Sequence, residues 1–254
     1  MPGRTKRPNS APKSAARRRK LGVACYNADM KLPRRSPGIE LTVILLFASV
    51  VSLILYAAAV QRAGQLIFTY LPWNLVLAWI PFGLAVLLMR LLKTQPWSNW
   101  TTLIVTLLWL VFLPNSFYMV TDFIHLSAAF PEDLVTDTVL FSSFVFTGLL
   151  VGYSSLYLVH RALRRRLSAW WSVGVVAAVL AACSLAIYIG RDLRWNSWDV
   201  LTNPAGLLFD VSDRLVHPSE YGAILSMGLS FFVFLLGMYV VMWRLFALGA
   251  RRND

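Results

Sequence analysis

The stretch Leu41-Thr-Val-Ile-Leu-Leu-Phe-Ala-Ser-Val-Val-Ser-Leu-Ile-Leu-Tyr-Ala-Ala-Ala-Val60 contains no charged side chain and is long enough to cross a bilayer as a helix. A spanning helix needs about 20 apolar residues, because in lipid every backbone N–H and C=O must be bonded internally. Similar stretches recur along the chain, which is 57% hydrophobic and only 14% charged. The sequence therefore predicts an all-α fold, a polytopic transmembrane helix bundle with six spans, at residues 41–60, 73–92, 100–121, 136–159, 169–190 and 222–245.

Basic residues are distributed unevenly between the two ends of these spans. Most of the 24 lysines and arginines lie in the tail before residue 41, in the connections 90–99 and 160–168, and at the C-terminal end. Positive charge resists translocation, so this side is predicted to be cytoplasmic, with both termini inside. Most of the 12 acidic residues fall on the other side, which is therefore chemically distinct.

The net charge of +12 raises the question of a nucleic-acid partner. Much of this charge lies in clusters such as Arg17-Arg-Arg-Lys20 and Arg164-Arg165-Arg166, with no aromatic residues interleaved and no recognisable binding module. Basic residues near a membrane surface attract anionic headgroups by about 1 kcal/mol each. We therefore expect the partners to be the lipid bilayer and anionic lipid headgroups at the cytoplasmic face, with no nucleic acid.

The domain organisation follows from the same patterns. Residues 1–37 are rich in basic residues, Pro, Ser and Ala, and are predicted to be a disordered basic cytoplasmic tail. Met30 precedes a sufficient basic lead-in, and we expect translation to begin there. Residues 38–250 are predicted to form a single transmembrane helical domain, with a short amphipathic helix near 205–215 on the outer surface.

Small residues predict a close helix contact on the fourth span. Gly148 and Gly152 are spaced four residues apart and therefore lie on one face of the helix. A small-xxx-small pattern lets two helix backbones approach closely.

A first polar segment lies at the outer end of the third span, after Pro114. If the helix continues, about 100° per residue gathers its polar side chains within an arc of about 120°, and these are Asn115, Tyr118, Thr121, Asp122 and His125. We expect this face to point into the bundle or a wet vestibule, with Asn115 and Tyr118 as candidate ligand-binding residues. Asp122 and His125, at i and i+3, are candidates for a general base, a proton relay or half of a metal site. The alternative is a structural hydrogen-bonded pair. Two ligands alone make an incomplete metal site.

A second polar segment, Gly190 to Pro204, follows the fifth span. Its candidate ligand-binding residues are Arg191, Asp192, Arg194, Asn196 and Asp199. Arginine suits bidentate contact with a carboxylate or phosphate, so a small anionic ligand is one interpretation. The other is an Arg–Asp lock that ties the fifth span to the third through Asp122.

Three strings of the sequence carry a further signal: Trp73-Asn-Leu-Val-Leu-Ala-Trp-Ile-Pro81, Phe112-Leu-Pro-Asn-Ser-Phe-Tyr-Met-Val-Thr-Asp-Phe-Ile-His-Leu126 and Gly190-Arg-Asp-Leu-Arg-Trp-Asn-Ser-Trp-Asp199. On these strings the chain resembles a bacterial membrane-protein family called domain of unknown function 1361. The resemblance covers roughly residues 45–245. It implies a multi-pass protein of a bacterial plasma or inner membrane. The family has no established activity, so the resemblance implies no catalytic residue and no cofactor.

Three function classes are consistent with these features. The first is an outer-face site that handles a polar ligand or a proton, in an enzyme or a binding protein. The second is a structural or assembly protein in which the Arg, Asp and His residues are helix locks, and the third is a transporter. The sequence contains no nucleophile elbow, Walker loop, Rossmann fingerprint or Cys/His zinc pattern, and it leaves the oligomeric state open.

Overall fold

The computed structural model describes residues 37–128, 134–192 and 222–251, and single positions between 202 and 216. The chain divides into two compact units, Met1–Val43 and Ile44–Asp254. In the first unit, residues 37–43 begin a helix in which Thr42 Oγ1 donates to the Gly38 carbonyl at 2.8 Å. The predicted tail lies outside the described residues except for Pro37, and the predicted helix near 205–215 lies largely outside them.

Every long element among the described residues is helical. In chain order these elements are α2 (Pro37–Ala63), α3 (Tyr70–Leu91), α4 (Trp100–Tyr118), η1 (Met119–Ala128), α5 (Leu134–Leu163), α6 (Ala169–Asp192) and α9 (Gly222–Arg251).

Within this part of the chain, 6 helical segments are long and apolar enough to cross a membrane: Gly38–Ala63, Tyr70–Leu91, Trp100–Leu126, Leu134–Leu163, Ala169–Arg191 and Ser226–Leu245. The six-span, all-α prediction is confirmed, and the protein is a multi-pass membrane protein. Five of the six segments differ from the predicted spans by only a few residues at each end. The third segment differs most from its prediction: it ends at Leu126, whereas the predicted span ends at residue 121, because the helix changes type and does not stop.

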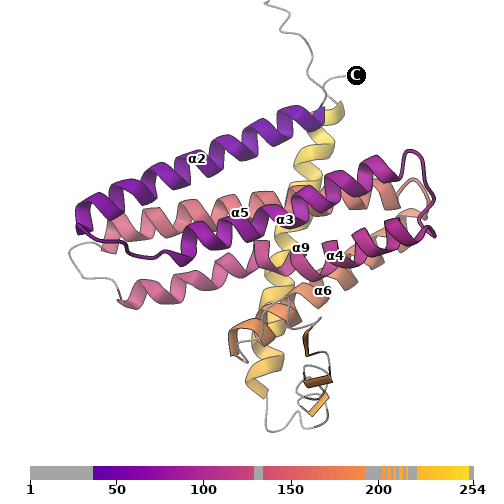
Figure 1. The fold of residues 1–254 in the computed structure, drawn as a ribbon. Helices are drawn as coiled ribbons and strands as arrows, with labels where there is room; N and C mark the ends of the chain where they lie inside the picture. The colour runs from indigo at the N-terminus through magenta and orange to yellow at the C-terminus, as the bar shows by residue number, and fades with distance from the viewer. Residues whose placement is uncertain are drawn as a thin grey trace, which may run out of the picture. The chain divides into compact units, whose positions relative to one another are not determined.

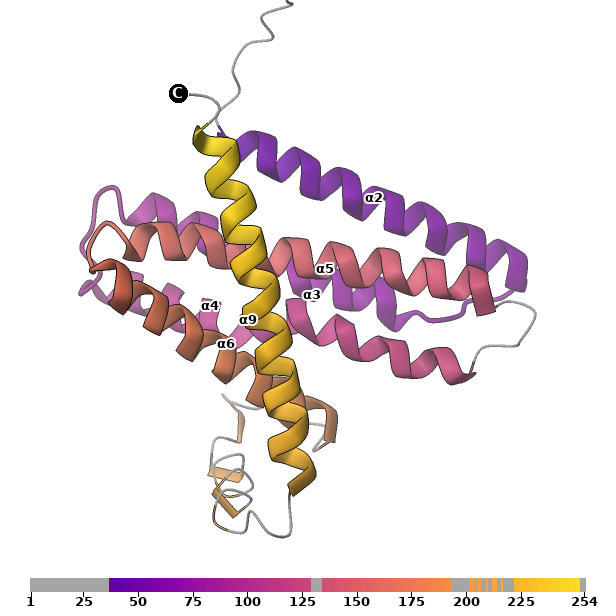
Figure 2. The same ribbon diagram turned by 180° about the vertical axis from the view of Figure 1, so that it is seen from behind.

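The helices of the second unit pack around α3 and α5. Figure 1 shows α3 lying alongside α4 and α5, and these are its most extensive contacts. On the other side α9 crosses over α5 and packs on α6 (Figure 2). Polar bonds join α2 to its neighbours: Trp79 Nε1 donates to Ser49 Oγ at 3.0 Å, and the hydroxyls of Ser52 and Thr147 lie 3.1 Å apart.

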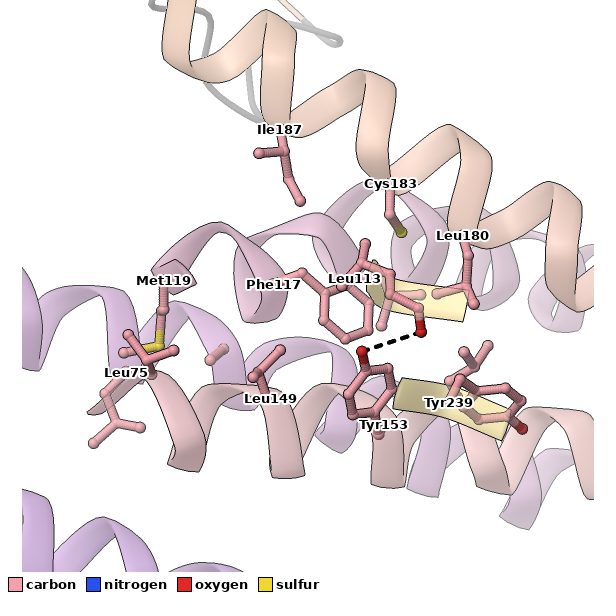
Figure 3. Close-up of a cluster of buried hydrophobic side chains, with 14 of the residues drawn as sticks. Leu75, Leu113, Phe117, Met119, Leu149, Tyr153, Leu180, Cys183, Ile187 and Tyr239 are labelled. Atoms are coloured by element: carbon pink, nitrogen blue, oxygen red, sulfur yellow. Dashed lines mark hydrogen bonds between the residues drawn. The ribbon is translucent and has the colours of Figure 1, made fainter. Parts of the chain in front are cut away.

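Large apolar side chains fill the interior between α4, α5, α6 and α9 (Figure 3). Phe117 and Leu113 point toward α5, and Cys183 faces the same cluster from α6. The Tyr153 hydroxyl donates to the Leu235 carbonyl at 3.1 Å, which links α5 to α9. Phe117, Leu113 and Cys183 are completely buried, so the middle of the bundle is a dry, packed core.

Buried serines bridge the helices near the proline of α3. Ser116 Oγ donates to the Ala78 carbonyl and Ser155 Oγ to the Pro81 carbonyl, each at 3.0 Å. Trp109 Nε1 in turn donates to Ser155 Oγ at 2.8 Å. Proline disrupts the regular hydrogen bonds of the surrounding helical turn, and neighbouring Ser side chains can bond the carbonyls there. These bonds set the position of α3 against α4 and α5.

Gly148 and Gly152 allow the end of α4 to lie directly on α5. A Cβ atom at Gly152 would lie 2.7 Å from Ser116 Cβ and 2.9 Å from Phe117 Cε1. At Gly148 it would meet the Met119 side chain and lie 3.0 Å from the Ser116 carbonyl oxygen. The predicted close contact on the fourth span is confirmed, and it positions the first residue of η1.

Candidate functional site

The third span ends in a 3₁₀ helix that carries Asp122 and His125. Helix α4 continues through Pro114 to Tyr118 and then tightens into η1. A 3₁₀ helix has 3 residues per turn, so residues spaced i and i+3 lie on the same face, and runs longer than about 3 or 4 residues are uncommon. Asp122 is only 2% exposed, whereas His125 is exposed. One face of η1 therefore runs from the buried interior to the surface.

The Asp122 carboxylate is the point where α3, η1 and α6 meet. Asn74 Nδ2 on α3 donates to Asp122 Oδ2 at 3.0 Å. Arg191 on α6 lies within electrostatic reach of this carboxylate, and its Nη1 donates to the Thr121 carbonyl at 3.4 Å. A buried charge is costly unless it is paired and hydrogen-bonded. The neutral amide and the nearby guanidinium supply this compensation from two different helices.

His125 contacts an aromatic ring rather than the carboxylate one turn earlier. Its ring lies 5.0 Å from that of Tyr70, between centroids, at an interplanar angle of 53°. The Asp122 carboxylate is bonded to Asn74 instead. The hydrogen-bonded Asp122–His125 pair considered from the spacing is therefore not formed, because the buried carboxylate turns toward α3 and the imidazole toward the surface.

Tyr70, the first residue of α3, lies at the centre of this group. Its hydroxyl is buried and has no hydrogen-bond partner among the described residues, and the carboxylates of Asp122 and Asp137 are both within electrostatic reach. Its ring packs against Phe68 at 6.2 Å and Phe141 at 6.4 Å. Phe68 has a φ of 48°, a left-handed conformation that costs a bulky residue on the order of 1 kcal/mol. The rings of Phe68, Phe141 and His125 all pack against the Tyr70 ring and hold it in place.

An ion pair closes the same region between α2 and α5. Arg62 Nη2 lies 2.9 Å from Asp137 Oδ1, and the two side chains are 36% and 5% exposed. The buried carboxylate is in the first turn of α5, where the helix dipole also favours negative charge. Two buried carboxylates therefore flank Tyr70, each compensated from another helix.

A family model described as "Protein of unknown function (DUF1361)" matches residues 73–236. The chain belongs to this family. The match includes Asn74, Asp122, His125 and Arg191, and it begins three residues after Tyr70. No curated protein and no solved structure matches the chain significantly.

Of the other candidates in this DUF1361 protein, Asn115 and Tyr118 are half-buried on α4, and the Tyr118 carbonyl accepts a bond from Thr121 Oγ1 at 2.8 Å. Asp192 is the last residue of α6, and its side chain is not described. Arg194, Asn196 and Asp199 lie outside the described residues. Their role as ligand-binding residues stays a prediction.

Sequence reasoning missed four residues of this group. Asn74 bonds Asp122 and Tyr70 packs on His125, while Asp137 is within electrostatic reach of Tyr70 and is paired with Arg62. Tyr70 and Asn74 are spaced i and i+4 at the start of an apolar span, so the signal of a shared polar face was present. Asp137 is an acidic residue at the start of another span, but its pairing with Arg62 depends on how two distant helices pack.

The side chains of this group are of types that can form hydrogen bonds and exchange protons. The group combines a phenol hydroxyl, an imidazole and two carboxylates, with two arginines beside them. Among the described residues, no three His, Cys, Asp or Glu side chains gather to hold a metal ion. Imidazole, phenol and carboxylate are the groups that most often act as general acids and bases.

Proposed function

We propose that this DUF1361 protein is a bacterial inner-membrane protein whose extracytoplasmic face carries a site that handles a small polar ligand or a proton. The Tyr70 hydroxyl carries the proposal, because it is buried beside two buried carboxylates and no described residue bonds it. Leaving such a group unpaired costs about 1–3 kcal/mol. A ligand atom that bonds this hydroxyl would remove that cost.

The local charges favour a polar ligand without a large net charge. Arg62 and Arg191 balance Asp137 and Asp122. Since Arg191 donates to the Thr121 carbonyl, its guanidinium is already partly used. A ligand with a hydrogen-bond acceptor for Tyr70 and a polar group for the exposed His125 suits the group best. The excess of basic residues at the other ends of the helices supports the extracytoplasmic assignment.

A structural function is the second candidate. The Asn74–Asp122 bond and the Arg191–Thr121 bond together hold α3, η1 and α6 at one point. That arrangement is also what a helix lock requires. Transport has less support, because the fully buried Leu113 and Phe117 and the buried Leu149 occupy the middle of the bundle.

Replacing Tyr70 by Phe separates the ligand site from the lock. Native mass spectrometry of the detergent-purified protein is expected to show a small-molecule adduct in the wild type and none in Tyr70→Phe, because the substitution removes only the hydroxyl. The melting temperature should stay equal or rise, since no bond of that hydroxyl is lost. Tyr56→Phe, which removes a hydroxyl from a ring packed on Phe144, serves as the control and should keep the adduct.

The proton-handling version of the site has its own measurement. Infrared difference spectra between acidic and neutral pH should contain a carboxyl band that Asp122→Asn removes and that Tyr70→Phe shifts. If neither an adduct nor such a band is found, and Tyr70→Phe behaves like Tyr56→Phe, the site is a structural lock only.

A separate prediction concerns the helix lock formed by the Asn74–Asp122 bond. Asn74→Leu removes the amide that bonds a carboxylate which is 2% exposed, and should lower the free energy of unfolding by about 2 kcal/mol. Adding Asp122→Leu removes the carboxylate that has lost its hydrogen bond and should recover most of this loss. Denaturation in mixed micelles with sodium dodecyl sulfate measures both. Failure of the double variant to recover would show that Asp122 has further stabilising partners.

A further inference from the structure

The opposite end of the bundle carries an aromatic cluster built around a buried histidine. His160, near the end of α5, is 3% exposed, and its Nδ1 lies 2.8 Å from the Tyr239 hydroxyl on α9. Its ring stacks on Trp243 with centroids 4.0 Å apart, at 31°. Tyr157 packs on the same tryptophan at 5.3 Å. Two side chains of α5 therefore pack on the tryptophan ring.

Two arginines lie over the outer rings of this cluster. Arg164 Cζ is 5.8 Å from the ring centroid of Trp243, and Arg161 Cζ is 5.9 Å from that of Tyr157. Both arginines are exposed. A guanidinium stacked on an aromatic face is pre-organised, and its N–H donors remain available at its edge. The two side chains thus present fixed donors to whatever lies beside this helix end.

These arginines differ from Arg62 in their electrostatic surroundings. Neither α5 after Asp137 nor α9 contains an acidic residue, so neither helix supplies a carboxylate at this end. At the other end of α5, by contrast, Arg62 is bonded to Asp137 at 2.9 Å. An anion from outside the protein is therefore the natural counter-charge for Arg161 and Arg164.

The cluster also lies at the depth of the membrane interface. The two spans that form it end at Leu163 and Leu245. The next span begins beside Trp170 and Trp171, which are 87% and 73% exposed, as is typical of interfacial tryptophans. Lipid phosphates occupy this level of a bilayer.

We propose that Arg161 and Arg164 form a binding site for the phosphate of an anionic phospholipid, with His160 as a positioning residue. Planar guanidinium groups match phosphate oxygens in bidentate geometry. Apolar surface for the acyl chains lies on α9, the helix that carries Trp243, where Val240 and Val241 are about half exposed, at 51% and 53%. His160 does not touch the phosphate, because it is buried; it fixes the tryptophan on which Arg164 rests.

The test measures lipid binding to the full chain, delipidated in detergent, by native mass spectrometry with added phosphatidylglycerol. Arg164→Gln should weaken binding about tenfold, the loss expected for one charge-assisted contact. Arg166→Gln removes the same charge from the same helix end without a ring contact, and should change binding less than twofold. Arg164→Lys, which keeps the charge but loses the stacked plane, should fall between them.

Two further arms identify the ligand and the role of His160. Phosphatidylcholine, which has no net charge, should bind at least tenfold more weakly than phosphatidylglycerol, and millimolar inorganic phosphate should not displace the lipid. His160→Phe keeps a stacked ring but loses the bond to Tyr239, and should weaken phosphatidylglycerol binding. Added to Arg164→Gln, the same substitution should cause no further loss of binding, because His160 acts through Arg164.

Three results would overturn the proposal. Equal losses in Arg164→Gln and Arg166→Gln would reduce the effect to general surface charge. Equal binding of the two lipids would remove the anionic requirement, and displacement by inorganic phosphate would assign the site to a soluble phosphate. A melting temperature equal to that of the wild type confirms that each variant is folded.

Discussion

Gly152→Ala is expected to destabilise the protein by about 1–3 kcal/mol, the usual cost of overpacking a well-packed interior. The new Cβ atom would lie 2.7 Å from Ser116 Cβ and 2.9 Å from a ring carbon of Phe117. Neither neighbour is the free end of a flexible side chain, so α4 must move away from α5. Ser116 also donates to the Ala78 carbonyl, so the shift is expected to reach α3.

The matched control for this variant is Gly174→Ala. Gly174 is also inside a spanning helix, but a Cβ atom there would meet nothing within 4 Å. Alanine is favoured over glycine in helices by up to about 1 kcal/mol, so this variant should be neutral or more stable. Unfolding in mixed micelles with sodium dodecyl sulfate compares the two. Equal stability of both variants would mean that the α4–α5 contact is looser than the structure indicates.

Arg62→Met should lower the free energy of unfolding by about 2–3 kcal/mol, because it leaves the Asp137 carboxylate buried without its cation. Breaking a fully buried ion pair costs about 3–5 kcal/mol. The arginine side chain is 36% exposed and the aspartate 5%, so water screens part of the interaction and the loss should be smaller. Because the pair joins α2 to α5, the variant should also expose α2 to proteolysis earlier than the rest of the bundle.

The double variant Arg62→Met/Asp137→Leu provides the control. An apolar pair of similar volume commonly replaces a buried ion pair at little cost, so most of the lost stability should return. The same unfolding measurement applies to both. If the double variant were as unstable as Arg62→Met, the loss would come from packing around Arg62 rather than from the buried charge.

Much of the fold could be predicted from the sequence, because the property that decides it is local. A run of about 20 apolar residues favours the lipid phase whatever the rest of the chain does. The six spans were predicted on this basis and are confirmed, and so is the close helix contact at Gly148 and Gly152. The orientation with both termini inside stays a prediction from the distribution of charge.

The candidate site was predictable only in part. The polar face with Asp122 and His125 follows from helical periodicity, and both residues do lie on one face of η1. Their partners do not follow from it, because Asn74 meets Asp122 across 48 positions of sequence and Tyr70 meets His125 across two different spans. The change from α to 3₁₀ geometry after Tyr118 falls where Met119 packs on Gly148 of α5, a contact that no local pattern specifies.

The sequence by itself determined that this chain crosses a membrane six times and where its polar residues interrupt the spans, because hydrophobicity and charge are carried by consecutive residues. Only the tertiary structure decided which polar groups meet: Asn74 with Asp122, Arg62 with Asp137, and His160 with Tyr239 and Trp243. Such pairs depend on the crossing and register of whole helices. Those are set by the summed packing of many side chains, such as the close contact at Gly152, and not by the residues that finally touch.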